Sequence, residues 1–206
     1  MIQRIQVGPR LSQAVVHGKT AYLAGIVADD GVVLRLGPAH FVVSCSSSHV
    51  AGMAAALEAW RQDRFDLPEV FIHDATAHWA TIGVSGPSAK AVVGGLGLGV
   101  DLDDSRFPHM SVRAAEFGGR AARVARVSFT GERSYEISVP ARFGAALWQR
   151  AREAGAIPLG IEALGVLRAE KGYIYVGQDT DGETMPRSAP PSIRPRAIGW
   201  PSCTLR

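Results

Sequence analysis

Cysteine is scarce in this chain: Cys45 and Cys203 are the only two among 206 residues. Cys45 stands in an apolar run and Cys203 in an irregular tail, so we expect no disulfide framework and a reduced compartment. No CxxC pair and no His/Cys cluster has the spacing of a zinc site. The cysteine content therefore predicts a cytoplasmic protein without a metal centre.

Long apolar runs and charge of one sign are absent as well. No segment reaches the roughly 20 apolar residues that span a bilayer, and the N-terminus carries Arg4 and Arg10 without the continuous apolar core of a signal peptide. The formal net charge is only +3, and no nucleic-acid-binding motif accompanies it. We expect neither a membrane nor nucleic acid as a partner.

What the chain does contain is typical of a globular α+β protein. Apolar residues make up 47% and charged residues 20%, with 23 glycines for turns. Alternation and turn signals predict antiparallel strands within 13–25 around a turn at 17–19, at 31–36 and 41–45 around a turn at 37–40, and at 70–72, 78–84, 111–117, 123–129 and 134–139.

Helical periodicity predicts four helices, at about 49–64, 89–96, 141–154 and 161–171. In the first of them Met53, Leu57 and Trp60 fall on one face. Gly172 is expected to end the last one. Residues 185–196 hold four prolines and three arginines without periodicity, so a disordered tail is predicted there.

Glu136 is the candidate binding residue that the pattern makes most unusual, because it follows an aromatic inside an apolar strand. A carboxylate is costly to bury there unless it meets hydrogen-bond donors. A ligand with two adjacent N–H groups would satisfy it, and so would an arginine fork. A surface strand position is an equally good interpretation of the residues alone.

Other polar segments have simpler interpretations. Asp29 and Asp30 precede a strand and point to opposite faces, so they cannot act as a facing pair. The segment 94–99 is rich in glycine but lacks the order of a dinucleotide or phosphate loop, and a flexible connection is expected. Residues 167–173 mix charge into a helix end, for which a solvated surface is the favoured interpretation.

Several segments, taken in order, resemble the folate-binding aminomethyltransferase (glycine-cleavage T-protein) superfamily, and most closely its version at the C-terminal end of the sarcosine oxidase alpha subunit. They are Asp29-Asp-Gly-Val-Val-Leu-Arg-Leu36, Val84-Ser-Gly-Pro87, Phe107-Pro-His-Met110, Val127-Ser-Phe-Thr-Gly-Glu132, Tyr135-Glu136, Leu167-Arg-Ala-Glu-Lys-Gly-Tyr173 and Val176-Gly-Gln-Asp-Thr-Asp-Gly182.

The resemblance implies a site for tetrahydrofolate that accepts a one-carbon unit from an aminomethyl or methylene-iminium donor. Asp30 matches the family's essential aspartate, which orients or activates the folate nitrogen. Phe129 matches an aromatic residue against the folate, and Glu136 matches the carboxylate that binds the pterin N–H donors. Tyr135 is expected at the same cofactor site.

The chain departs from the family pattern at a few places. Leu164 stands where T-proteins carry an arginine, and Ser134 where a glycine is usual. The family's opening segment is expected to be missing before Asp29, and its C-terminal β-rich portion to be replaced after Gly182. We therefore expect an incomplete version of the fold.

Residues 2–30 have a separate resemblance, to the start of the reactive-intermediate (enamine/imine) deaminase family. The quoted similarity lies in 2–18, 22–25 and 27–30. That family's carboxylate-binding arginine would lie beyond the matching segment, so deaminase activity is the weaker alternative.

Together these observations predict an α+β protein with a partial folate-binding aminomethyltransferase-like fold, antiparallel sheets with packed helices, preceded by a foreign β-hairpin. The expected divisions are 1–28, 29–182 and 183–206. The predicted function is folate-dependent one-carbon transfer, with folate and other subunits of an amine-oxidising complex as partners. The alternatives are a non-catalytic assembly module, a chimeric fragment or an imine deaminase.

Overall fold

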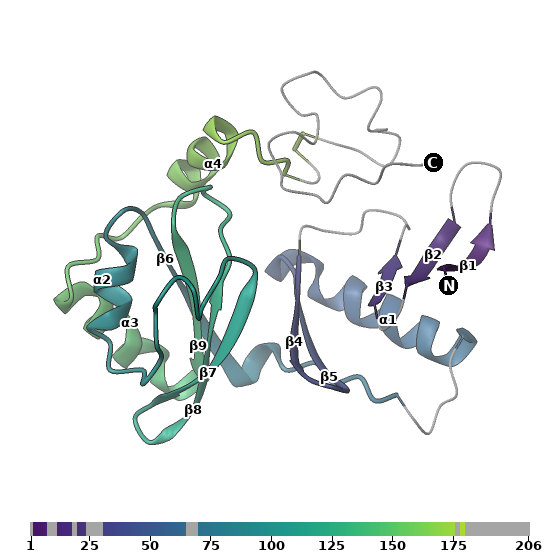
Figure 1. Cartoon of the computed structure of the whole chain (residues 1–206), viewed down its shortest axis with the longest axis horizontal. Helices are drawn as coiled ribbons and strands as arrows, with labels where there is room; N and C mark the ends of the chain where they lie inside the picture. Colours follow the sequence, from purple (N-terminus) through teal and green to yellow (C-terminus); the bar gives the residue numbers. More distant parts are fainter. Residues whose placement is uncertain are drawn as a thin grey trace.

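The computed structural model describes residues 2–7, 12–17, 20–23, 31–64, 70–175 and 178–179. Three antiparallel sheets lie within these residues (Figure 1). The first contains β1 (Ile2–Val7), β2 (Ser12–His17) and β3 (Thr20–Leu23), and the second β4 (Val32–Gly37) and β5 (His40–Ser44). The third contains β6 (Trp79–Ser85), β7 (Ser111–Phe117), β8 (Arg120–Arg126) and β9 (Ser134–Pro140), in the order β6-β9-β8-β7.

Four α-helices accompany these sheets in the described part of the chain. They are α1 (Val50–Arg64), α2 (Ala89–Gly94), α3 (Gly144–Glu153) and α4 (Ile161–Glu170). Short 3₁₀ turns precede three of the elements: η1 (Ser47–His49), η3 (Thr76–His78) and η4 (Ala141–Phe143). The predicted mixture of helices and antiparallel sheets is confirmed, and Gly172 does end α4, with a φ of 73° that favours glycine.

One predicted strand, at 70–72, is wrong. Residues 70–75 have no regular secondary structure, and Phe71 is 88% exposed. An apolar run forms a strand only where a neighbouring strand supplies its hydrogen bonds, and no described strand pairs with this one. The predicted disordered tail, 183–206, lies outside the described residues.

The hydrophobic core lies between one face of the β6–β9 sheet and the helices α2 and α3 (Figure 1). The sheet contributes alternate residues of each strand, and the helices contribute one stripe each. Each fully buried aliphatic or aromatic side chain contributes about 1.5–3 kcal/mol to folding. The members that are no more than 3% exposed include Val93, Phe107, Phe117, Val124, Tyr135, Ile137, Val139 and Leu147.

The glycine-rich segment 94–99 belongs to this core, in contrast to the flexible connection expected. Leu96 is fully buried and Leu98 is 3% exposed. Gly97 and Gly99 have φ values of 69° and 65°, which leucine would adopt only with strain. The glycines therefore shape a loop whose leucines pack inward.

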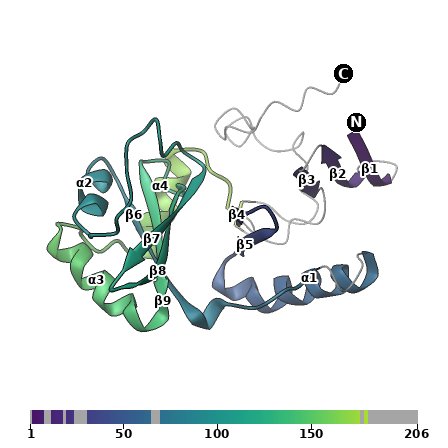
Figure 2. The same ribbon diagram turned by 60° about the horizontal axis from the view of Figure 1, so that its bottom comes forward.

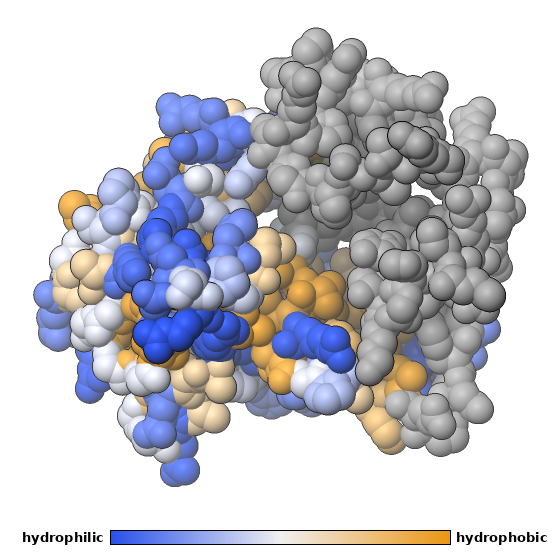
Figure 3. Space-filling model, in the orientation of Figure 1, coloured by the Kyte–Doolittle hydropathy of each residue, from blue (hydrophilic) through white to orange (hydrophobic). Residues whose placement is uncertain are grey.

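The β4–β5 hairpin and α1 lie outside the core. In both views β4 and β5 lie on the side of the sheet opposite α2 and α3 (Figures 1 and 2), and β4 contacts β7. Apolar residues gather around this hairpin (Figure 3), with Val33, Phe41 and Val43 each about half exposed or more. Within 50–63 no residue of α1 is buried. Met53 and Leu57 of the predicted face are half-buried, but Trp60, its third member, is 42% exposed.

Candidate functional site

The strand β9 presents alternate side chains to two different environments. Tyr135, Ile137 and Val139 enter the core. Because successive strand residues point to opposite faces, Ser134, Glu136 and Ser138 face away from α2 and α3. We call this second surface of the β6–β9 sheet the open face.

The open face is built from small and polar residues. On β6, Thr81, Gly83 and Ser85 are exposed and lie opposite Ser138, Glu136 and Ser134 of β9. Hydroxyl pairs join the two strands on either side of Glu136. The Ser85 and Ser134 Oγ atoms are 2.7 Å apart, and the Thr81 Oγ1 and Ser138 Oγ atoms are 2.9 Å apart. These bonds satisfy the hydroxyls locally and leave the carboxylate between them without a neighbouring hydroxyl donor.

Glu136 is half-buried, and this burial raises the pKa of its carboxyl group above the ordinary value. No hydrogen bond or ion pair to its carboxylate is present among the described residues. The arginine nearest in strand register is Arg123, which lies diagonal to it on β8. The Arg123 guanidinium stacks 4.1 Å from the centre of the Trp79 ring. The arginine fork that would satisfy Glu136 from within the protein is therefore not formed in this region.

Gly83, which pairs directly with Glu136, leaves room beside the carboxylate. A Cβ atom added at Gly83 would meet no atom within 4 Å. A partly desolvated carboxylate without a protein partner, next to open space, is suited to a ligand that brings paired N–H donors.

Phe129 lies in the connection between β8 and β9, seven residues before Glu136 along the chain. It is half-buried, and its ring meets the edge of Tyr175 with ring centres 5.8 Å apart. Phe129 lies within the connection at 127–133, and Glu136 is the third residue of the strand that follows it.

Arg168 fixes the segment after α4 that contacts the β8–β9 connection. This side chain is buried, 8% exposed, so the solvated helix end favoured by the sequence is wrong for this residue. Its guanidinium donates to the Tyr173 carbonyl (3.1 Å), to Gln178 Oε1 (3.2 Å) and to the Asp179 carboxylate. Asp179 in turn accepts from the Tyr175 backbone N–H at 2.8 Å. Arg168 and Asp179 thereby fix the turn that presents Tyr175 to Phe129.

A second contact joins the same two segments. The Lys171 ammonium lies 2.8 Å from Glu132. The backbone of Gly131, at φ 76°, lies so close that an added Cβ would be 2.2 Å from Lys171 Cγ. We call residues 168–175 and 178–179 the clamp, because Lys171 and Tyr175 in it contact the β8–β9 connection at Phe129, Gly131 and Glu132. No sequence signal other than the family resemblance marks the clamp as a unit.

Two of the expected site residues are not placed beside Glu136. Tyr135 is fully buried in the core, where its ring packs against Phe107 with centres 6.0 Å apart. Since it points to the opposite face of β9, it cannot contact a ligand held by Glu136. Asp30 lies outside the described residues. Its neighbour Gly31 approaches the Ser44 carbonyl so closely that a Cβ would be 2.2 Å from the oxygen.

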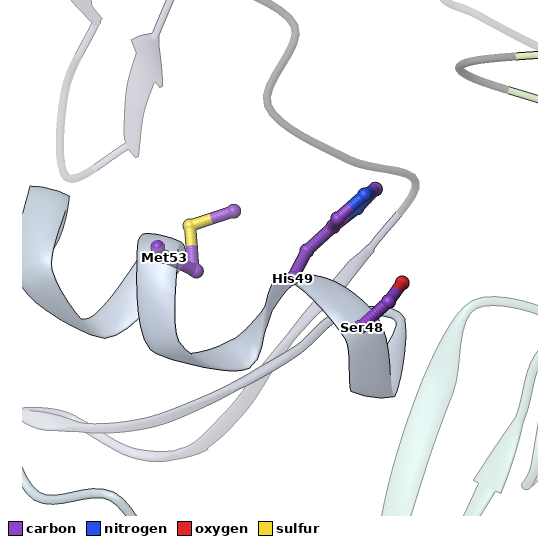
Figure 4. Close-up of a pocket in the computed structure, with 4 residues that line it drawn as sticks. Ser48, His49 and Met53 are labelled. Atoms are coloured by element: carbon purple, nitrogen blue, oxygen red, sulfur yellow. The ribbon is translucent and has the colours of Figure 1, made fainter.

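Two of the pockets in the described part of the chain lie near residues discussed above. One, of about 330 Å³, is lined by Ser48, His49, Gly52 and Met53 at the start of α1 (Figure 4). Ser48 and His49 are consecutive residues in this lining. The other, of about 370 Å³, lies where β8 leads into β9 and includes Ser134 of the open face.

Neither a membrane-spanning helix nor a metal-ligand cluster is found in the described ranges. No helix there is both long and apolar enough to cross a membrane. Within the same ranges, no group of three or more His, Cys, Asp or Glu side chains is placed to hold a metal ion.

The family model and the relatives that match this chain all indicate the same family. The model of the GCVT N-terminal domain matches residues 10–190. Over 178 residues the chain is 39% identical to the sarcosine oxidase subunit alpha of Corynebacterium sp. (strain P-1), covering 84% of this chain and 18% of that protein. Over 166 residues it is 32% identical to an aminomethyltransferase of Thermus thermophilus, covering 81% of this chain and 46% of that protein.

The fold agrees with these matches. The glycine cleavage system aminomethyltransferase T from Bartonella henselae superposes with a TM-score of 0.64 at 24% identity, over 81% of this chain and 44% of that one. The chain spans less than half the length of each of these relatives.

Proposed function

The chain belongs to the GCVT N-terminal domain family of folate-binding aminomethyltransferases, and from this premise we propose that it is a tetrahydrofolate-binding module for one-carbon transfer. Sarcosine oxidase alpha is the relative with the higher identity of the two curated proteins above. We therefore propose transfer of a methylene or aminomethyl group released from an amine, in company with other subunits of an amine-oxidising complex.

The observation that carries this proposal is the state of Glu136. Its carboxylate is half-buried, has no partner among the described residues and lies beside the open space at Gly83. A pterin ring presents adjacent N–H donors, which an ionised carboxylate accepts side by side. The residues present therefore fit the ligand that the family implies.

Each site residue has a separate proposed role. Glu136 holds and orients the pterin through its N–H donors, and Phe129, braced by Tyr175, provides an apolar surface beside it. Asp30, assigned through the resemblance alone, orients the reacting nitrogen and takes part in its proton transfer. Bound tetrahydrofolate supplies the nucleophilic nitrogen that accepts the one-carbon unit.

The placement of β4 supports the role of Asp30. β4 begins two residues after Asp30 and lies on the side of the sheet that carries the open face (Figures 1 and 2). Gly31 is fixed against Ser44 at the end of the same hairpin. The start of β4 thus lies on the side of the sheet where a ligand of Glu136 would bind.

The direct test is a titration with reduced folate followed by thermal unfolding. A ligand that binds the folded chain raises its stability by RT ln(1 + [L]/Kd). We expect a concentration-dependent rise in the unfolding midpoint for the unmodified chain and no rise for Glu136→Gln. The matched control is Glu116→Gln, an exposed carboxylate on β7 of the same sheet, which should keep the full rise.

A non-catalytic assembly module is the second candidate. The exposed apolar residues Val33, Phe41 and Val43 of the β4–β5 hairpin favour it, because patches of this kind mark contact surfaces. Cooperative unfolding without any shift at millimolar reduced folate would support this alternative and contradict the first.

A further inference from the structure

The pocket between β8 and β9 differs in character from the open face that it adjoins. Its wall includes His109, Arg126, Arg133 and Tyr173, the hydroxyl-bearing residues Ser128 and Ser134, and the carboxylate-bearing residue Glu132. It therefore combines two arginines and neutral hydrogen-bond donors with one carboxylate, in a volume of about 370 Å³.

The charges around this pocket are unequal. The Asp104 carboxylate accepts from Arg133 at 2.7 and 2.8 Å, lies 3.2 Å from Arg126 Nη1, and lies 3.6 Å from Lys90 Nζ. One negative charge thus faces three positive charges. The neighbouring pair of Lys171 and Glu132 is balanced and changes nothing in this sum. Asp103 also interacts with Lys90 and adds a second negative charge, so one positive charge remains uncompensated within the cluster.

Arg126 is the cation best placed to use this excess. Its side chain is only 15% exposed, so its charge is poorly screened by water. Nη1 donates to the Phe107 carbonyl at 2.6 Å and contacts Asp104. The other guanidinium nitrogens have no hydrogen bond in the described part of the chain. A mostly buried guanidinium with unused donors at the wall of a pocket is suited to an oxyanion.

We propose that this pocket is a binding site for an oxyanion, a carboxylate or phosphate group of a small molecule, with Arg126 as its principal donor. Arg133, His109 and the Ser128 hydroxyl complete the set of donors. The Asp104 carboxylate competes with the anion for these cations and holds them in place when the anion is absent. Ser134 lies two residues from Glu136 on the same strand face, about 7 Å away. Arg126 alternates with Ala125, the partner of Glu136, and so extends from the opposite face of the sheet, and a ligand that uses both sites must pass around the end of the strands.

The site is tested with inorganic phosphate and glutarate as probes, at constant ionic strength set with potassium chloride. We expect saturating phosphate or glutarate to raise the unfolding midpoint by about 3 °C relative to chloride alone. Arg126→Gln should weaken the apparent affinity by about tenfold or more, since charged hydrogen bonds are lost. Arg120→Gln removes the same charge at the other end of β8 and should leave the affinity unchanged.

Asp104→Asn gives the opposite expectation and keeps the test decisive if Arg126→Gln does not fold. Removal of the competing carboxylate should tighten phosphate binding several-fold. The proposal is overturned if phosphate and glutarate act no differently from chloride, or if Arg120→Gln and Arg126→Gln weaken binding equally.

The source of the anion is settled by comparing tetrahydrofolate with 6-methyltetrahydropterin, which lacks the glutamate carboxylates. If the site holds the folate's own carboxylate, Arg126→Gln weakens tetrahydrofolate and leaves the pterin unaffected. If it holds a separate anion, both ligands are unaffected and the phosphate response alone is lost. Phosphate binding does not need Glu136, so Glu136→Gln should leave it intact, and failure of the folate proposal would not be mistaken for failure of this one.

Discussion

The two faces of the β6–β9 sheet are built from the same strands and have opposite compositions. On one face Val124, Tyr135 and Ile137 are fully buried against helices. On the other face the residues between them, among them Gly83, Glu136 and Ser138, are small or polar. The difference teaches that one face stabilises the fold with large apolar side chains, while the other, although Ala125, Ser134 and Ser138 are buried there, keeps open space beside Gly83 and a carboxylate in a setting that costs stability.

The largest change in stability is expected on the face of the β6–β9 sheet that packs against α2 and α3. Ile137→Ala should destabilise the chain by about 3 kcal/mol, because it removes fully buried carbon atoms and leaves a cavity. Thr81→Ala on the open face should cost about 1 kcal/mol or less, since it removes one hydroxyl pair with Ser138. Urea unfolding of the two variants checks the order, and equal losses would break the distinction between the faces.

The clamp should give the next largest effect. Asp179→Asn leaves the buried Arg168 guanidinium without its charged partner and should cost about 2 kcal/mol. Asp63→Asn, at a carboxylate on the exposed side of α1, is the control and should change stability little. If the clamp positions Phe129, Asp179→Asn should also weaken reduced-folate binding at temperatures where the chain remains folded. Unchanged affinity would reduce the clamp to a purely structural role.

Alanine substitutions at Gly131 and Gly119 distinguish backbone strain from a collision with Lys171. Gly131→Ala and Gly119→Ala both place alanine at a φ above 70°, which costs about 1 kcal/mol each. At Gly131 the new Cβ also collides with Lys171, whereas at Gly119 it meets nothing within 4 Å. We therefore expect Gly131→Ala to lose the more stability in thermal unfolding. Equal losses would show that Lys171 moves aside freely and does not hold the connection.

The smallest effect concerns the pH dependence of Glu136. Burial raises the pKa of its carboxyl group from the ordinary 4.5, so the folded state favours the protonated form. Stability from this group is present below pH 4.5 and falls as the pH rises through the higher folded value. Glu136→Gln should remove that fall and leave the ligand-free chain more stable at neutral pH than the unmodified chain. A steeper fall in the variant would contradict the assigned burial.

Much of the fold follows from sequence patterns. Strong alternation in 111–117 and 134–139 and the periodicity of 141–154 predict the elements that form the core, because each buries one face. The strand at 70–72 could not be excluded, since an apolar triplet carries no information about a partner. Burial of Leu96 and Leu98 was also unpredictable, because it depends on loop glycines that bring them to distant helices.

The candidate site was less accessible to sequence patterns. The residues alone left Glu136 divided between a ligand site and the surface, because alternate residues of β9 do not say which face helices cover. The resemblance places Tyr135 at the cofactor together with Glu136. Neighbouring strand residues face opposite ways, however, and the tyrosine side chain is buried in the core. Arg168 looked solvated because its partners, Gln178 and Asp179, come from beyond the helix end.

The central claim is that a ligand occupies the open face beside Glu136, and Gly83→Val tests it most directly. The new side chain begins in space where a Cβ meets nothing within 4 Å, on a strand that favours β-branched residues. We predict that this variant keeps the stability of the unmodified chain and loses tetrahydrofolate binding in isothermal titration calorimetry. An unchanged binding isotherm in a fully folded Gly83→Val chain would contradict the account.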